Sequence, residues 1–174
     1  KFDINEEALR PYFSVENVIK GIFKVADLLY GLQFKEIFDV PVYHKDVRVF
    51  QVKEKDGNFL SLLYIDLHPR ETKSGGAWMT SWRSQGIFEG KLERPLISIV
   101  ANLTPPSNDL PALLTYDEVN TIFHEFGHAL HGMLSNVTYR SLASPDVYWD
   151  FVELPSQIME NWLSEKETLR LFAK

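Results

Sequence analysis

The sequence predicts an α+β protein: a small, mostly antiparallel or mixed sheet packed with helices, one of which carries an HExxH motif. Apolar residues recur at helical spacing in the first third of the 174-residue chain, alternate in the middle, and return to helical spacing in the last third. We find no internal repeat and no low-complexity tract. This order predicts one unit over residues 1–174, with helix over 1–35, sheet over 36–104 and helices over 112–174.

The first predicted helix begins after Ser14, whose side chain can cap it, and stops at Gly31. The apolar residues between these positions lie three and four apart, as on the core-facing side of an amphipathic helix. They are Val15, Val18, Ile19, Ile22, Phe23, Ala26, Leu29 and Tyr30.

The middle of the chain changes to the spacing of strands. Asp56 and Gly57 lie between two apolar segments and predict a tight hairpin, because both residue types tolerate a positive φ. Turn-rich residues at 73–76 and 104–108 border two further candidate strands. The four expected strand segments are 47–52, 59–67, 77–80 and 96–101.

Composition narrows the possible partners and sites. The net charge is −6 and the basic residues are scattered, which argues against nucleic acid and against an anionic membrane surface as partners. No apolar run approaches the ~18 residues of a membrane span. The chain has no cysteine, so a metal must be held by His, Asp or Glu, and a reducing, cytoplasmic location is expected. The chain starts at Lys1 rather than at Met, and we expect it to be an excised segment.

The last third contains a helix with the residues of a zinc site. Thr115 and Glu118 form a capping-box pattern that opens this helix. His124 and His128 are four residues apart, so their imidazoles project from one face and can hold one metal ion. Glu125, about 100° further round the helix, can contact water at the metal without being a ligand. The motif predicts metal-assisted hydrolysis.

Two histidines leave a zinc ion short of ligands, and the third must come from elsewhere. A third-histidine arrangement would need glycine at 131 and histidine at 134, where the chain has His131 and Leu134. A carboxylate on the next helix remains, and Pro155 indicates that this helix starts nearby. Spacing alone does not choose among Asp146, Asp150, Glu153 and Glu160.

The chain also resembles a known family at several motifs. FHEFGHALH at 123–131, followed by DFVELPSQ at 150–157, is similar to the thimet oligopeptidase family of zinc metallopeptidases, in particular to its bacterial peptidyl-dipeptidases and oligopeptidases. The upstream segments YHKDVRVF at 43–50, YIDLHPR at 64–70 and NLTPP at 102–106 extend the resemblance over nearly the whole chain.

The resemblance implies a zinc peptidase that acts on short peptides and releases C-terminal dipeptides or cleaves internally. It implies one Zn²⁺ held by His124, His128 and Glu153, with Glu125 as the general base. Family members are several times longer, so the remaining parts of such an enzyme are expected partners, and this chain alone is expected to have weak or no activity. The alternatives are a non-catalytic zinc-binding module and a different zinc hydrolase.

Other residues carry weaker expectations. By the resemblance, Gly76 and Ala77 belong to a segment beside the active site where an edge strand can pair with an extended peptide substrate; the alternative is a hairpin connection with a packed Trp78. Glu160, seven residues past Glu153, is expected either to orient a ligand histidine or to be solvated. Asp150 is expected to cap the helix that starts near Glu153. His131 is expected to make a structural hydrogen bond. Packing or structural roles are expected for Trp149, Trp162, His44 and His68.

Overall fold

The structure, a computed structural model, describes residues 5–107 and 110–174. Residues 1–4, at the start of the region expected to be helical, and Asn108, in a predicted turn, lie outside the described residues. No helix in the described ranges is long and apolar enough to cross a membrane.

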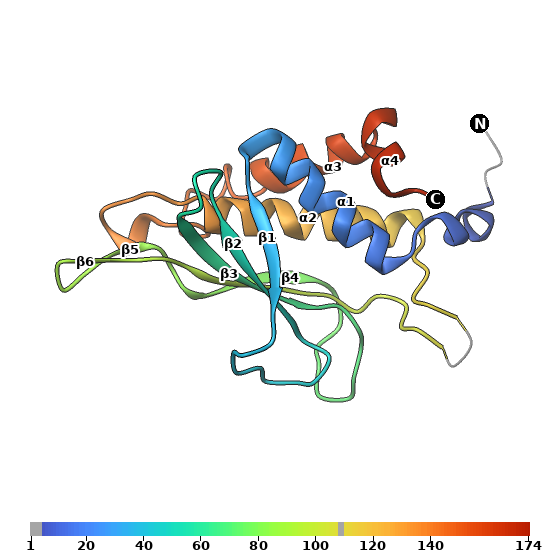
Figure 1. Cartoon of the computed structure of the whole chain (residues 1–174), viewed down its shortest axis with the longest axis horizontal. Helices are drawn as coiled ribbons and strands as arrows, with labels where there is room; N and C mark the ends of the chain where they lie inside the picture. Colours follow the sequence, from blue (N-terminus) through green and yellow to red (C-terminus); the bar gives the residue numbers. More distant parts are fainter. Residues whose placement is uncertain (1–4, 108–109) are drawn as a thin grey trace.

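A five-stranded mixed sheet forms the centre of the fold, as expected. Its strands stand in the order β1-β2-β3-β7-β4, with β3 and β7 parallel and the other neighbours antiparallel. A separate two-stranded hairpin, β5 and β6, projects from one end of the molecule (Figure 1). The bounds are β1 Gln33–Ile37, β2 Arg48–Lys53, β3 Phe59–Asp66, β4 Trp78–Arg83, β5 Gly86–Phe88, β6 Lys91–Glu93 and β7 Leu96–Val100.

Helices α1 and α2 cover one face of this sheet, and α3 and α4 pack behind them (Figure 1). The core lies between the helices and the sheet, where the side chains of Leu63, Ile97, Phe123 and Phe126 are fully buried. The helices are α1 Val15–Tyr30, α2 Tyr116–Met133, α3 Leu154–Leu163 and α4 Lys166–Phe172, with short 3-10 helices at Glu6–Tyr12 and Arg140–Leu142.

Both long helices begin where their sequence signals predict, and α1 also ends at its predicted stop. The Ser14 hydroxyl accepts a hydrogen bond from the Asn17 amide at the start of α1, and Gly31 ends that helix with φ 71°. At the start of α2, Thr115 and Glu118 make both hydrogen bonds of a capping box. Glu118 also accepts from the amide and hydroxyl of Thr104, so the helix start is tied to the segment that follows β7.

Three features differ from the sequence expectations. Strand β1 begins at Gln33, within the range expected to be helical, because it pairs antiparallel with β2 directly after the Gly31 stop. The β5–β6 hairpin was not expected, since its strands are only three residues long. Trp149, expected to pack, is 91% exposed, because it lies in the irregular connection between the 3-10 helix at Arg140–Leu142 and α3.

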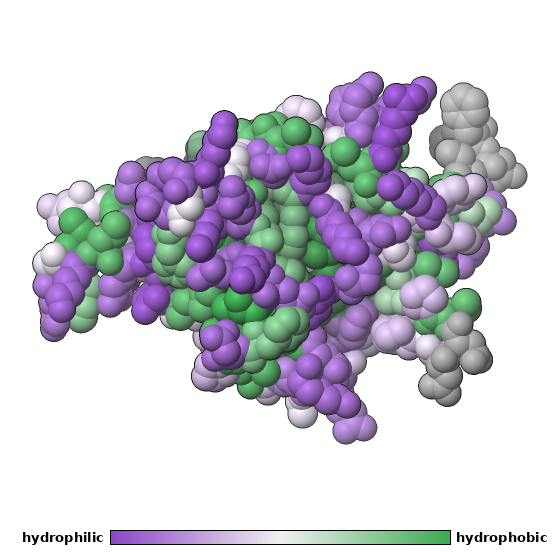
Figure 2. All heavy atoms as spheres, in the orientation of Figure 1, coloured by the Kyte–Doolittle hydropathy of each residue, from purple (hydrophilic) through white to green (hydrophobic). Residues whose placement is uncertain are grey.

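The projecting hairpin exposes apolar side chains rather than polar ones. Ile87, Phe88 and Leu92 are half or more exposed. The green atoms at the left end of Figure 2 mark this apolar surface. The hairpin is joined to the body through Gly86, whose Cα approaches the Arg140 backbone so closely that a Cβ there would lie 3.0 Å from it. Arg140 also lies over the Phe88 ring, 5.1 Å from its centroid.

Candidate metal centre and active site

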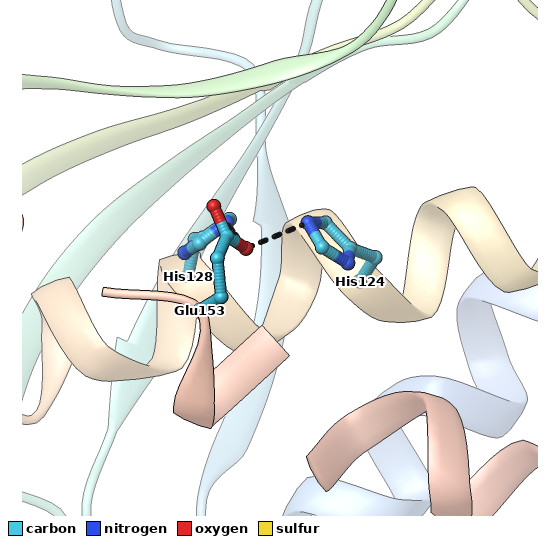
Figure 3. Close-up of side chains that lie close together, drawn as sticks. All are labelled: His124, His128 and Glu153. Carbon is cyan, nitrogen blue, oxygen red and sulfur yellow. Dashed lines mark ion pairs between the residues drawn. The ribbon is translucent and has the colours of Figure 1, made fainter. Parts of the chain in front are cut away.

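Three side chains from two helices bring their ligand atoms together. His124 and His128 project from α2, and Glu153 reaches them from the start of α3 (Figure 3). The Glu153 Oε2 atom lies 3.2 Å from His124 Nε2 and 3.1 Å from His128 Nε2. Among the described residues, His124, His128 and Glu153 form a group whose ligand atoms lie close enough together to hold one metal ion.

The two distances from Glu153 Oε2 match the ligand separations of a zinc site. Ligands at 2.0–2.1 Å from a tetrahedral zinc ion are separated from one another by about 3.3 Å. Two imidazole nitrogens and one carboxylate oxygen leave a fourth position open, as in catalytic rather than structural sites. The residues present therefore fit a zinc ion.

Close backbone contact between α2 and α3 sets this geometry. A Cβ built on Gly127 would lie 2.5 Å from both Pro155 O and Ser156 Cα, so only glycine permits the observed approach. Glycine inside a helix lowers helix stability by about 1 kcal/mol relative to alanine. Here the absence of a side chain allows the two helices to touch. Glu153 is the N-cap residue of α3 and Pro155 lies in its first turn, as the sequence indicates.

Glu160 lies against the first histidine from the side opposite the ligand atoms. Its Oε1 is 2.5 Å from His124 Nδ1. With Glu160 ionised, the proton of the imidazole sits on Nδ1, and the lone pair of Nε2 is directed toward Glu153 and His128. Of the two expectations for Glu160, the arrangement has the geometry of the orienting carboxylate.

Ser156 orients the Glu153 carboxylate, a contact that the sequence analysis did not anticipate. The fully buried Ser156 hydroxyl lies 2.8 Å from Glu153 Oε2 and 2.8 Å from Glu153 O, and it can donate to either. The hydrogen bond from Ser156 lowers the pKa of Glu153, and the nearby histidines add to this against the effect of burial. A serine three residues after a capping position is the available sequence signal.

Glu125 stands apart from the three ligand atoms and is buried, with only 6% of its surface exposed. Burial raises the pKa of Glu125, the charge of His124 lowers it, and Glu153 raises it further, so that the net pKa is above the usual glutamate value. A raised pKa makes a carboxylate a better proton acceptor near neutral pH. Glu125 thus has the environment of a general base.

Burial also lowers the pKa of both His128 and His131. For His128 this favours the neutral imidazole that a metal requires. His131 does not make the expected hydrogen bond through Nδ1, which is buried without a partner among the described residues. Its ring packs edge-on against Phe151 instead, at 5.9 Å between centroids.

Three further residues from the sequence analysis have clear positions, Asp150, Gly76 and Ala77. Asp150 does not cap α3, because the N-cap residue is Glu153 and the helix start has no side-chain capping hydrogen bond, so that prediction was wrong. Gly76 and Ala77 directly precede β4, which is an edge strand of the sheet because it pairs with β7 alone. Met79 of β4 lies next to Gly132, one helical turn beyond His128.

The chain matches a family of known proteins over its whole length. The model of peptidase family M3 matches residues 1–174. The chain belongs to peptidase family M3. It is 42% identical to the dipeptidyl carboxypeptidase of Escherichia coli over 175 residues and 44% identical to oligopeptidase A of the same organism over 170 residues. It is also 42% identical over 181 residues to the organellar oligopeptidase A of Arabidopsis thaliana.

These matches cover all or nearly all of the chain but a small part of each relative. The alignments span 100%, 97% and 100% of the chain, and 25%, 25% and 23% of the three relatives respectively. Membership of family M3 makes the chain part of a metallopeptidase family, which agrees with the resemblance seen in its motifs.

Proposed function

We propose that this chain forms the zinc-binding active site of a metallopeptidase that hydrolyses short peptides. The observation that carries the proposal is the convergence of His124, His128 and Glu153 within 4.8 Å of one another. A bound Zn²⁺ would supply Lewis acidity, which polarises a peptide carbonyl and makes water more acidic. The chain's own residues supply the remaining functions.

The general base in this proposal is Glu125. Its carboxylate accepts a proton from water as the water attacks the carbonyl carbon, and later delivers that proton to the leaving amine. The raised pKa of Glu125 supports both steps, because the group must bind the proton and then release it. Glu160 and Ser156 hold His124 and Glu153 in their orientations.

The names of the relatives support the substrate class of this proposal. The names dipeptidyl carboxypeptidase and oligopeptidase A describe enzymes that release dipeptides or cleave short peptides. We extend this activity to the present chain and propose that the extended peptide binds by strand addition along the free edge of β4, beginning at the Gly76–Ala77 segment that leads into it.

The partner in this proposal is further polypeptide of the same enzyme. A groove of about 440 Å³ next to Gly127 and His131 is lined mostly by apolar residues of α2, α3 and the segment between them. Apolar side chains around it are strongly exposed, which is unusual for a free surface. They include Leu142 at 60%, Tyr148 at 89%, Trp149 at 91% and Phe151 at 46%. Coverage of this surface by the rest of a longer chain explains its composition.

Zinc binding and hydrolysis test the proposal separately. We expect the wild-type chain to bind one Zn²⁺, Glu153→Ala to weaken zinc binding by about 100-fold, and Glu125→Gln to retain zinc. Asp150→Ala is the matched control, since this carboxylate lies three residues before Glu153 and outside the ligand group. Equal zinc affinity in Glu153→Ala and wild type would remove Glu153 from the site.

Activity is measured in a chimera, because the chain spans about a quarter of its relatives. The chain replaces the matching segment of the Escherichia coli dipeptidyl carboxypeptidase, and the products from a mixture of short peptides are identified by mass spectrometry. We expect released C-terminal dipeptides, and their loss in Glu125→Gln. A zinc-loaded, folded chimera that cleaves no peptide would favour a non-catalytic zinc module.

A further inference from the structure

A cluster of buried charges lies outside the metal group, at the end of β3. Asp66 is 1% exposed and the side chain of Lys73 is 2% exposed. Arg70 donates to both Asp66 carboxylate oxygens at 2.9 Å, and Lys73 donates to Oδ1 at 2.9 Å. The Tyr43 hydroxyl donates to Oδ2 at 3.0 Å. Burying the Asp66 carboxylate and the Lys73 ammonium is costly, and this cluster plays no part in the chemistry proposed above.

The cluster shapes the segment that leads into the edge strand. Residues 67–77 leave β3, pass across the end of β7 and enter β4, since β7 lies between these two strands. This crossover segment extends from the end of the sheet in Figure 1. Lys73 also donates to the main-chain oxygens of Asp66 and His68, at 3.0 and 2.9 Å, which folds the first half of the segment back onto β3.

A different side chain holds the second half. Asn102, two residues past the end of β7, donates from Nδ2 to Ser74 O and to Gly76 O, both at 2.8 Å. Gly76 has φ 89°, so its carbonyl direction depends on a conformation that few other residues adopt. One amide group therefore fixes the backbone immediately before Ala77 and the start of β4.

We propose that Asn102 is a positioning residue, which holds the Gly76–Ala77 backbone in the orientation that accepts an extended peptide, while Asp66 and Lys73 anchor the first half of the same segment. The inference rests on the proposed function, because it requires that a peptide bound at the metal group also pairs with the edge of β4. Preorganised backbone of this kind improves peptide affinity, since less conformational freedom is lost on binding.

Asn102→Ala provides the sharpest test. Asn102 is only partly buried, and its replacement removes two hydrogen bonds without opening the core. Asn102→Asp is the second variant: it keeps the size of the side chain and removes both N–H donors. Asn58→Ala is the matched control, since the Asn58 side chain bonds only within the β2–β3 hairpin.

Two hydroxamates separate the contribution of the metal from that of the strand. Acetohydroxamate probes the metal alone, and an N-acetyl tripeptide hydroxamate adds the peptide backbone. Affinities are measured by calorimetry on the zinc-loaded chain. We expect acetohydroxamate to bind wild type and all variants equally, and the tripeptide to bind wild type more tightly than acetohydroxamate. In Asn102→Ala and Asn102→Asp this gain falls by about tenfold, with Asn58→Ala unchanged.

Hydrogen exchange gives a readout that does not depend on the metal. Amides at 74–78 should exchange about tenfold faster in Asn102→Ala, while those of α2 stay protected. Unchanged exchange, or an unchanged gain from the tripeptide in a variant that binds acetohydroxamate normally, would overturn the positioning role. Failure of wild type to bind acetohydroxamate would instead overturn the metal proposal, and the inference with it.

Discussion

The metal group and the crossover segment before β4 are held in place by opposite kinds of contact. At the metal group, α2 and α3 touch through backbone atoms at Gly127, beside an apolar core. In the crossover segment, the Lys73 ammonium and the Asn102 amide donate to main-chain oxygens, which are those of Asp66, His68, Ser74 and Gly76. The first region therefore depends on volume and the second on charge, so each has its own set of damaging changes.

The largest expected effect is on the charged region. Asp66→Asn removes the partner of the buried Lys73 ammonium and of Arg70, and we expect it to lower the free energy of unfolding by about 3–5 kcal/mol. Urea unfolding followed by circular dichroism measures this change. Asp39→Asn, at an exposed position, should be neutral. A loss below about 1 kcal/mol in Asp66→Asn would show that the charges are not what holds this segment.

Acid should act on the same region. Burial raises the pKa of Asp66, but the hydrogen bonds from Arg70 and Lys73 outweigh it, and the net pKa lies below the usual value. The stabilising contribution of a carboxylate with a lowered pKa is complete above its unfolded pKa of about 3.9 and is lost as the pH falls through its folded pKa. We expect this loss below about pH 4, and a smaller acid dependence in Asp66→Asn. The other carboxylates with lowered pKa values, which would leave some dependence, are Glu36, Glu118 and Glu153.

The next effect concerns volume at the metal group. Gly127→Ala would place a methyl group against the backbone of Pro155 and Ser156, and we expect a loss of about 1–3 kcal/mol despite the better helix propensity of alanine. Zinc affinity should fall with it, because Glu153 moves with α3. Gly132→Ala is the control in the same helix: its methyl would meet the end of the Ile97 side chain, which can turn aside. Equal effects of the two variants would contradict a specific role for Gly127.

A smaller effect is expected from the residue behind His124. Glu160→Gln keeps the shape of the side chain and weakens the hold on His124 Nδ1, so the zinc dissociation constant should rise about tenfold, equivalent to about 1.4 kcal/mol. Competition with a chromophoric chelator measures the constant. Glu165→Gln, on the neighbouring helix and outside the metal group, should leave it unchanged. If both variants bind zinc as wild type does, Glu160 has no orienting role.

The smallest effect lies at the start of the active-site helix. Thr115→Ala removes the side-chain half of the capping box and should cost about 1 kcal/mol of unfolding free energy, with zinc affinity nearly unchanged. Thermal unfolding with and without zinc tests both parts. A large loss of zinc affinity in this variant would mean that the helix start and the metal group are coupled over more than two turns.

Local sequence predicts well the structural features that depend only on residues near one another in the chain. The caps at Ser14 and Thr115, the stop at Gly31 and the hairpin at Asp56–Gly57 are each decided by residues a few positions apart, and all were confirmed. The predictions for Trp149 and Asp150 were wrong because the contacts of these residues have no local cause. Their segment has no periodicity, and only the position of α3 decides what it contacts.

In the candidate site, too, local sequence predicted some features and the tertiary structure supplied the others. The i, i+4 spacing of His124 and His128 already puts two ligands on one helical face, and the glycine between them indicates a close approach. The choice of Glu153 came from the resemblance to a family, since spacing left four carboxylates open. The structure brings Glu153 to both histidines and places Glu160 behind one of them. The roles of these residues in zinc binding stay predictions until zinc is measured.

By itself, the sequence determined the α+β class, the two capped helices and the pair of histidines, because periodicity, capping and helical geometry act over a few residues. The tertiary structure alone decided which carboxylate meets those histidines and how the crossover segment is held. Gly127 meets Pro155 across 28 positions, and Asn102 reaches Gly76 across 26. Contacts over such separations depend on how the helices and strands pack, and no local pattern specifies them.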